Sequence, residues 1–308
     1  MQNKNHQPAG TLPAIGLALG GGGARGYAHL GVLKALHQSN IPVAVIAGTS
    51  MGAVVGAAYA AGRPIEELVE MALEMHWRRL FSLADLTLPR QGVLAGNRLE
   101  EYFNTLTKGK TFDQLDVPLT IVATDIATGK PVHLNSGPVA PAVRASMAVP
   151  GIFCPVKVGQ RLLVDGSIAT PVPVAAPLEA GATVVLAVDV CSSVDHSDVL
   201  VQTWRWLKTV RTRRVPQGVG LSAAWRFFKP TLPQCVSIVS RSLELCAHYP
   251  ATPALVALPG RYWRIRPAVD HVRWYEFHRA KECIDAGEAI GRQVAREITS
   301  VLEKGWSS

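Results

Sequence analysis

A serine enclosed by glycines is the first group in the chain that could act as a nucleophile. Residues 48–52 read G-T-S-M-G, with Ser50 at the centre, between an apolar β-branched run and a small-residue segment. This order predicts a strand, a sharp turn and a closely packed helix, which is typical of a nucleophile elbow. Gly48 and Gly52 are then needed because the two backbones run very close together. A plain strand-to-helix turn that contains a serine is the alternative that this pentapeptide leaves open.

A glycine-rich loop, G-G-G-G-A-R-G at 20–26, lies one β-α unit before the serine. Gly21, Gly23 and Gly26 fit the G-x-G-x-x-G dinucleotide pattern, but that site needs an acidic residue about 20 positions later. The first acidic residue of the chain is Glu66, and no Gly-Lys-Ser/Thr follows the loop as a P-loop requires. The remaining interpretation is a nest of backbone N–H groups that binds an anion, such as a tetrahedral oxyanion. We expect the side chain of Arg25 to pack the loop.

A serine nucleophile also needs a base. Asp165 follows a short predicted strand at 161–164, and Gly166 allows a tight turn that aims the carboxylate back over the sheet edge. We expect Asp165 at the carboxyl end of a parallel strand, where such sheets place their chemistry. An ordinary Asp-Gly turn is the alternative for this pair taken alone.

The elements that position these residues alternate between strands and helices, which predicts a parallel α/β sheet. Apolar runs predict a central parallel strand at 182–190 and an edge strand at 262–265. Asn97 and Glu100 resemble a capping box for a helix over 98–106. The other predicted strands are 14–19, 119–124 and its hairpin partner 130–134, and the other predicted helices are 27–38, 53–61, 64–79, 141–151, 173–180, 233–247 and 272–302, the last interrupted near Gly287 and Gly291.

Taken together, these features resemble the patatin-like phospholipases, a family of Ser-Asp dyad lipid acyl hydrolases. Residues 21–26 resemble the family's oxyanion loop, 48–52 its elbow and 165–167 its aspartate motif. Two further stretches are similar to bacterial members, A-S-M-A-V-P-G-I-F at 145–153 and V-A-T-D at 122–125. The resemblance covers roughly residues 15–190. Ser167 departs from the usual Gly or Ala of the aspartate motif, and because serine is small we expect little harm.

The resemblance implies a three-layer α/β/α patatin-like fold with a mainly parallel central sheet and a serine nucleophile elbow. It implies that Asp165 accepts the Ser50 proton while Ser50 attacks the carbonyl of a lipid or other fatty-acyl ester, as in a phospholipase A or lysophospholipase. The N–H groups of Gly22 and Gly23 would stabilise the oxyanion, with no cofactor. The implied oxyanion loop comprises Gly21, Gly22, Gly23, Arg25 and Gly26.

Two other functions remain open from the sequence. An α/β-hydrolase with a Ser-Asp-His triad would draw its base from the histidines after Asp165, although its elbow normally follows several strands. The domain could also be a non-enzymatic module that binds a lipid or a protein. No metal-ligand spacing is present, so no metal site is predicted. The histidines concerned are His196, His248, His271 and His278.

Charge and cysteine content indicate the binding partners and the cellular location that we expect for the protein. The 308 residues carry a formal net charge of +8, and seven Lys or Arg without any acid lie within 199–233. This local patch is interleaved with Trp and Phe, a composition typical of a segment at a membrane interface, whereas no nucleic-acid motif is found. The five cysteines form no C-x-x-C pair, which favours a reducing, cytoplasmic location. The basic aromatic segment adds the expectation of peripheral contact with a membrane.

The chain is accordingly divided into four parts. Residues 1–13 are predicted to be a disordered tail and 14–192 the catalytic domain. Residues 193–233 form the basic aromatic insert, a candidate membrane-docking segment. Residues 234–308 are expected to be a helical part that packs on the catalytic domain. We recognise neither a signal peptide nor a transmembrane segment.

Overall fold

The computed structural model describes residues 15–75, 82–83, 85, 94–191 and 261–303. The predicted tail at 1–13, the insert at 193–233 and the predicted helix at 233–247 lie outside the described residues. The same holds for His196 and His248.

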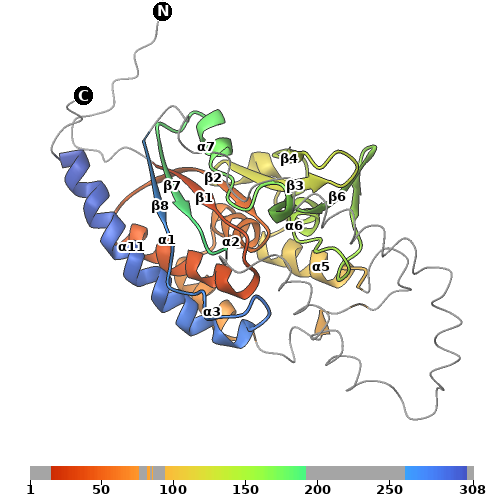
Figure 1. Cartoon of the computed structure of the whole chain (residues 1–308), viewed down its shortest axis with the longest axis horizontal. Coiled ribbons are helices and arrows are strands. Elements are labelled where there is room, and N and C mark those ends of the chain that lie inside the picture. Colours follow the sequence, from red (N-terminus) through yellow and green to blue (C-terminus); the bar gives the residue numbers. More distant parts are fainter. Residues whose placement is uncertain (1–14, 76–81, 84, 86–93, 192–260, 304–308) are drawn as a thin grey trace, which may run out of the picture.

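One sheet forms the centre of the described structure (Figure 1). Its eight strands follow the order β5-β6-β3-β2-β1-β7-β8, with β4 paired to β3 beside this path. Every residue of β1 (Ile15–Leu19) and β7 (Val184–Val188) is buried, because both faces of these apolar strands are covered. The other strands are β2 (Val43–Thr49), β3 (Leu119–Asp125), β4 (Pro131–Leu134), β5 (Val156–Val158), β6 (Arg161–Asp165) and β8 (Arg261–Ile265).

The sheet has a parallel and an antiparallel part. Strands β3, β2, β1, β7 and β8 pair in parallel, whereas β4 and β6 run against β3, and β5 runs against β6. The α/β class with a mostly parallel sheet is therefore confirmed, as are the β3–β4 hairpin and the edge position of β8 among the described strands. The expectation that the strand before Asp165 runs parallel to its neighbour is wrong, because β6 is antiparallel to β3. Gly159, at φ 60°, lies in a two-residue connection that returns β6 as the hairpin partner of β5.

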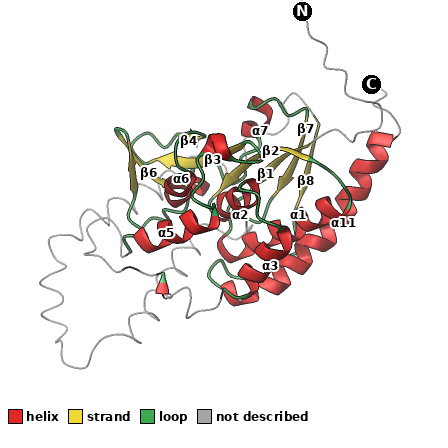
Figure 2. Ribbon diagram, turned by 180° about the vertical axis from the view of Figure 1, so that it is seen from behind, coloured by secondary structure: helices red, strands yellow, loops and turns green. Residues whose placement is uncertain are grey.

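Helices cover the two faces of the sheet unequally (Figure 2). On one face, α1 (Ala28–Gln38) and α2 (Met51–Ala60) bury apolar side chains such as Leu17 and Ile46, and α11 (Ala280–Glu303) lies along α1. The other face carries α7 (Ala175–Glu179) against β1, β2 and β7. The remaining described helices are α3 (Ile65–Leu73), α5 (Asn97–Leu106) and α6 (Val139–Ser146). None of the helices in the described ranges combines the length and the hydropathy that crossing a bilayer requires.

The C-terminal helix differs from the sequence-based expectation. It begins at Ala280 instead of residue 272 and runs without interruption through Gly287 and Gly291. A Cβ at Gly287 would collide with the carbonyl oxygen of Ala28, and one at Gly291 would lie 2.8 Å from the Cβ of Ala35. The glycines therefore allow α11 to approach α1 closely. That packing offsets their intrinsic helix penalty of about 1 kcal/mol each.

Three predicted helix ends also need correction. Helix α6 ends at Ser146 rather than at residue 151. Helix α3 ends at Leu73 rather than near residue 79. The first helical residue of α5 is Asn97 itself, so the predicted capping box is wrong. The carboxylate of Asp85 instead accepts the N–H groups of Gly96 and Asn97, at 2.7 Å each. Because this cap comes from a residue outside the helix and its flanks, the local pattern could not reveal it.

Candidate active site

Ser50 lies at the sharp turn between β2 and α2. Its backbone has φ 53° and ψ −121°, a region that residues with a side chain rarely adopt. A Cβ at Gly48 would lie 2.6 Å from the Cα of Ala53, and one at Gly52 would collide with the carbonyl of Leu19. Glycine at position 48 therefore lets β2 and α2 pack this closely, and glycine at position 52 lets α2 approach the end of β1. Helix α2 starts directly after Ser50, so the positive end of its dipole lies beside the hydroxyl.

A buried serine on α6 anchors the elbow. The Ser50 N–H donates to the Oγ of Ser146 at 2.8 Å, and Ser146 Oγ donates in turn to the carbonyl of Val122 at 2.6 Å. Ser146 is fully buried, so its hydroxyl satisfies two backbone groups that have no water nearby. Ser146 belongs to the 145–153 stretch, but no sequence pattern assigns it this role.

The carboxylate of Asp165 contacts Ser50 directly. Ser50 Oγ donates to Asp165 Oδ2 at 2.8 Å, and the second oxygen, Oδ1, accepts the N–H of Ser167 at 2.8 Å. The Sδ atom of Met147 lies 3.5 Å from Ser50 Oγ. Ser50 and Asp165 are each 5% exposed. The two predicted residues therefore meet in a nearly dry site, with no imidazole between the hydroxyl and the carboxylate.

The antiparallel direction of β6 explains how these residues meet. Asp165 pairs with Ala123 of β3, while Thr49 at the end of β2 pairs with Val122. The end of β6 thus reaches the level of the elbow from the opposite direction, with β3 between the two strands. The hydroxyl of Thr124 donates to the Asp165 carbonyl at 2.9 Å and holds the turn after β6. A Cβ at Gly166 would collide with the Val122 carbonyl, so this turn also requires glycine.

Burial raises the pKa of the Asp165 carboxyl above its ordinary value, because the charged form loses water. Hydrogen bonds from the Ser167 N–H and from the hydroxyls of Ser50 and Ser167 act in the opposite direction. A carboxylate with a raised pKa is a stronger proton acceptor than an exposed aspartate. It remains bonded to the one hydroxyl from which a proton would be taken.

The glycine loop faces the same place from the end of β1. The N–H of Gly21 donates to the Pro171 carbonyl at 2.9 Å, and the N–H of Ala24 donates to the Trp274 carbonyl at 2.7 Å. Within the described residues, the N–H groups of Gly22 and Gly23 have no hydrogen-bond partner. A Cβ at Gly21 would collide with Ser167 Oγ and lie 3.3 Å from the Cβ of Ser50. The loop therefore passes close to the serine with two free donors.

Buried side chains support the loop from behind. Arg25 is 8% exposed, and its Nε donates to the carbonyl of Gly22 at 3.3 Å, as its expected packing role requires. The fully buried His29 bonds through Nε2 to the carbonyl of Gly20 at 2.7 Å. Burial lowers the pKa of His29 to about 4, so the ring is neutral and Nε2 carries the proton. A Cβ at Gly26 would lie 2.4 to 2.6 Å from the side chain of Met51, which keeps the loop tight against α2.

Two of the histidines that follow Asp165, His271 and His278, lie within the described residues. The Nε2 of His271 contacts a carboxylate oxygen of Glu282 at the exposed start of α11. His278 belongs to a short 3-10 helix, Phe277–Arg279. In the described ranges, no group of three or more side chains that could ligate a metal comes together. Cys154, Cys191 and Cys283 are unpaired thiols.

Comparison with known proteins identifies the family to which the core of the chain is similar. A family model described as patatin-like phospholipase matches residues 17–178, which is just over half of the chain. An uncharacterised NTE family protein of Mycobacterium tuberculosis is 40% identical over 183 residues, covering 59% of this chain and 51% of that protein. Lysophospholipase nte1 of Aspergillus fumigatus is 30% identical over 93% of this chain and 18% of its own length.

A mouse relative and a solved structure extend the comparison. Patatin-like phospholipase domain-containing protein 6 of Mus musculus is 30% identical over 96% of this chain and 22% of its own length. The crystal structure of VipD from Legionella pneumophila aligns with a TM-score of 0.44 at 12% identity, over 93% of this chain and 67% of that one. The chain thus spans about half the length of the mycobacterial relative, and about a fifth of the fungal and mouse proteins.

Proposed function

The chain belongs to the patatin-like phospholipase family, and from this premise we propose that it is a serine hydrolase of lipid carboxylic esters. The observation that carries the proposal is the 2.8 Å hydrogen bond from Ser50 Oγ to Asp165 Oδ2. The fungal relative is named a lysophospholipase, which supports an ester of a phospholipid or lysophospholipid as the substrate.

In the proposed reaction, Ser50 Oγ attacks the ester carbonyl while Asp165 takes the hydroxyl proton. The carbonyl oxygen becomes an oxyanion that the N–H groups of Gly22 and Gly23 stabilise. Each such donor contributes about 10²–10³ in rate. The tetrahedral intermediate collapses, the C–O bond breaks, and the leaving alcohol receives the proton from Asp165. Water then attacks the acyl-serine with Asp165 again as base, releasing the fatty acid and restoring Ser50.

The geometry around Asp165 supports a dyad. A carboxylate in water is a weak base for a hydroxyl, but burial raises the pKa of Asp165 and so strengthens it as a proton acceptor. Its second oxygen is held by the Ser167 N–H, which fixes the direction of the first toward Ser50. A histidine is therefore not needed to carry the proton.

Ester hydrolysis by variants tests the proposal. Purified wild-type chain should release fatty acid from lysophosphatidylcholine micelles, and Ser50→Ala should lose that activity while keeping its circular dichroism spectrum and melting temperature. The exposed Ser136→Ala variant is the matched control and should retain full activity. Activity in Ser50→Ala equal to that of the control would refute the mechanism.

We further propose that the basic aromatic segment, residues 199–233, docks the enzyme on anionic membrane surfaces. Its composition supports this, because Lys and Arg attract anionic headgroups and Trp favours the interface. The segment lies outside the described residues. Flotation with phosphatidylserine-containing liposomes, with and without this segment, should show binding only in its presence. Equal flotation of both forms would refute the docking role.

A further inference from the structure

A C-terminal segment outside the region matched by the family model contacts the glycine loop. We call residues 271–279, which lie between β8 and α11, the brace. The carbonyl of Trp274 in the brace accepts the N–H of Ala24 at 2.7 Å. A Cβ at Gly23, whose φ is 58°, would collide with that same carbonyl oxygen. The brace backbone therefore lies directly against the loop that presents the N–H groups of Gly22 and Gly23.

A second contact joins the brace to the loop. The ring of Phe277 meets the ring of Tyr27 edge to face, with centroids 6.1 Å apart and planes at 82°. Tyr27 is the last residue of the 3-10 helix Gly23–Tyr27, which contains the second half of the glycine loop, and the residue is 6% exposed. Such aromatic pairs contribute about 0.5–1.5 kcal/mol beyond their buried area. The loop is thus held by the brace at both Ala24 and Tyr27.

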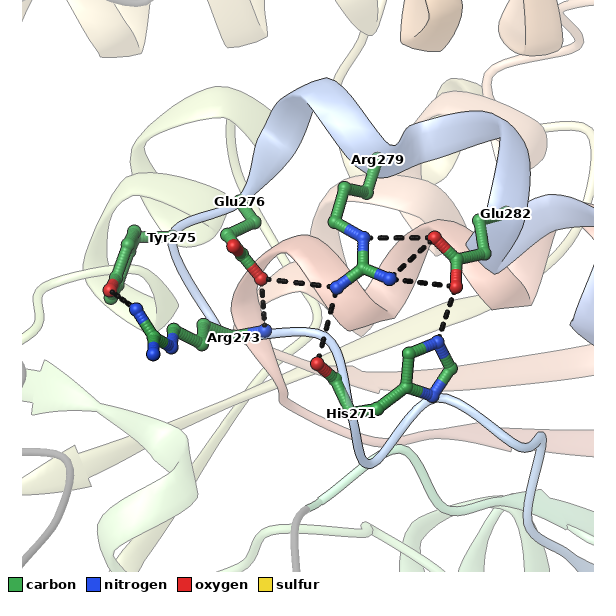
Figure 3. Close-up of polar contacts among 6 residues, drawn as sticks. All are labelled: His271, Arg273, Tyr275, Glu276, Arg279 and Glu282. Atoms are coloured by element: carbon green, nitrogen blue, oxygen red, sulfur yellow. Dashed lines mark hydrogen bonds and ion pairs between the residues drawn. The ribbon is translucent and has the colours of Figure 1, made fainter.

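One arginine ties the brace together (Figure 3). Arg279 Nη1 donates to the carbonyl of His271 at 3.2 Å and to Glu276 Oε2 at 3.4 Å. Its Nε and Nη2 donate to the two carboxylate oxygens of Glu282 at 2.8 Å each. Glu276 Oε2 also accepts the N–H of Arg273 at 2.8 Å. The guanidinium therefore joins the first residue of the brace, its central turn and the first turn of α11.

This arrangement fixes the Trp274 carbonyl. Trp274 lies between His271 and Glu276 in the sequence, and Arg279 holds both of these flanking positions. Glu282 connects the network to α11, which packs closely on α1 through glycine contacts at Gly31 and Gly287. The Trp274 carbonyl, which accepts the N–H of Ala24, is therefore held in place relative to the closely packed helices α1 and α11.

We propose that Arg279 is a positioning residue for hydrolysis. By fixing the brace, it holds the Trp274 carbonyl on Ala24 and thereby sets the direction of the Gly22 and Gly23 N–H donors toward the developing oxyanion. This inference rests on the proposed function for its catalytic consequence. Because oxyanion donors act on the transition state more than on the bound ester, loss of Arg279 should lower kcat and leave KM nearly unchanged.

The variants isolate this role. Arg279→Ala removes all the bonds that the Arg279 guanidinium makes, and Arg279→Lys keeps the charge but lacks the planar fork that reaches three partners. Lys281→Ala is the matched control, because it removes an exposed ion pair with Asp285 one turn into the same helix, away from the brace. Exposed ion pairs add little to global stability, so the melting temperatures of all three variants should agree within a few degrees.

Two readouts test the proposal. We expect kcat of Arg279→Ala to fall at least about tenfold, with KM within about twofold of wild type, since a misplacement of about 1 Å can reduce the rate about 100-fold. The kcat of Arg279→Lys should also fall, whereas the kcat and KM of Lys281→Ala should match those of wild type. By hydrogen–deuterium exchange, the amides of residues 20–27 should exchange about fivefold faster in Arg279→Ala, and those of β1 should not change.

The results separate the two proposals. Unchanged kcat and unchanged exchange at 20–27 in Arg279→Ala, or a loss of activity that follows KM or melting temperature alone, would overturn the positioning role. If the wild-type chain shows no Ser50-dependent hydrolysis, the proposed function fails. The exchange measurement then still decides whether Arg279 holds the glycine loop, because it does not depend on activity.

Discussion

The backbone strain at Ser50 allows a stability comparison that does not depend on any substrate. Replacing Ser50 by Ala or by Gly removes the hydroxyl and its bond to Asp165 in both variants, so that loss cancels between them. Alanine keeps a Cβ at φ 53°, whereas glycine adopts this conformation freely. The comparison therefore isolates the cost of placing a side chain at the elbow.

The two opposing terms set the expected magnitude. A residue with a side chain in a sparsely populated backbone region costs about 1–3 kcal/mol. Glycine loses about 0.5–1 kcal/mol more backbone entropy than alanine on folding. We therefore expect Ser50→Gly to be about 1 kcal/mol more stable than Ser50→Ala, with both variants inactive.

Urea-induced unfolding measures this difference through the midpoint and slope of each transition. Exposed Ser136, which has no positive φ, supplies the control: there Ser136→Gly should be less stable than Ser136→Ala, so the sign reverses. If Ser50→Gly is no more stable than Ser50→Ala, the elbow stores no strain and the reasoning about its geometry is wrong.

Four further perturbations test other parts of the structure. Burial raises the pKa of Asp165, and the reaction needs its charged form. The apparent pKa of the acid limb of the kcat/KM profile should therefore lie above the ordinary aspartate value of 3.8. An apparent pKa at or below that value would contradict the assignment of Asp165 as a buried base. The same raised pKa destabilises the fold where Asp165 is charged, so Asp165→Asn should be inactive yet more stable than wild type at pH 8, with the gain shrinking as the pH falls toward 3.8. Ser146→Ala removes the hydrogen bonds that Ser146 makes to the buried N–H of Ser50 and to the carbonyl of Val122, so the free energy of unfolding should drop by about 1–3 kcal/mol and kcat should fall. An unchanged urea midpoint would show that Ser146 does not anchor the elbow. Gly287→Ala should destabilise by about 1–3 kcal/mol because its Cβ meets the Ala28 carbonyl, whereas Asp285→Ala on the exposed face should not; a stabilised Gly287→Ala would mean that the glycine is not a packing contact.

The sequence could predict those parts of the site in which a glycine marks a close approach of two backbones. Gly48 is required by the close approach of its own strand and the next helix, whereas Gly52 approaches the Leu19 carbonyl of β1 and Gly166 the Val122 carbonyl of β3. Each requirement leaves a glycine at a fixed offset from a functional side chain. The glycine loop and the elbow were therefore visible as patterns, and the missing acid before Glu66 removed the nucleotide alternative.

Other parts depend on contacts between distant segments and leave no local pattern. The apolar residues of β6 carry no information on strand direction, so the antiparallel pairing that brings Asp165 to Ser50 was not predicted. Gly287 was interpreted from its helix propensity alone, whereas its packing against Ala28 decides its role. The Trp274 contact uses a backbone carbonyl, which every residue has and no sequence pattern marks.

Covalent labelling with a fluorophosphonate tests the central claim, that Ser50 is a nucleophile activated by Asp165, most directly. Intact-mass analysis followed by peptide mapping should find one adduct, on Ser50, in the wild-type chain. The adduct should be absent in Ser50→Ala and form far more slowly in Asp165→Asn, while Ser136→Ala should label like wild type. Labelling on another residue, undiminished labelling of Ser50→Ala, or a normal rate in Asp165→Asn would contradict the account.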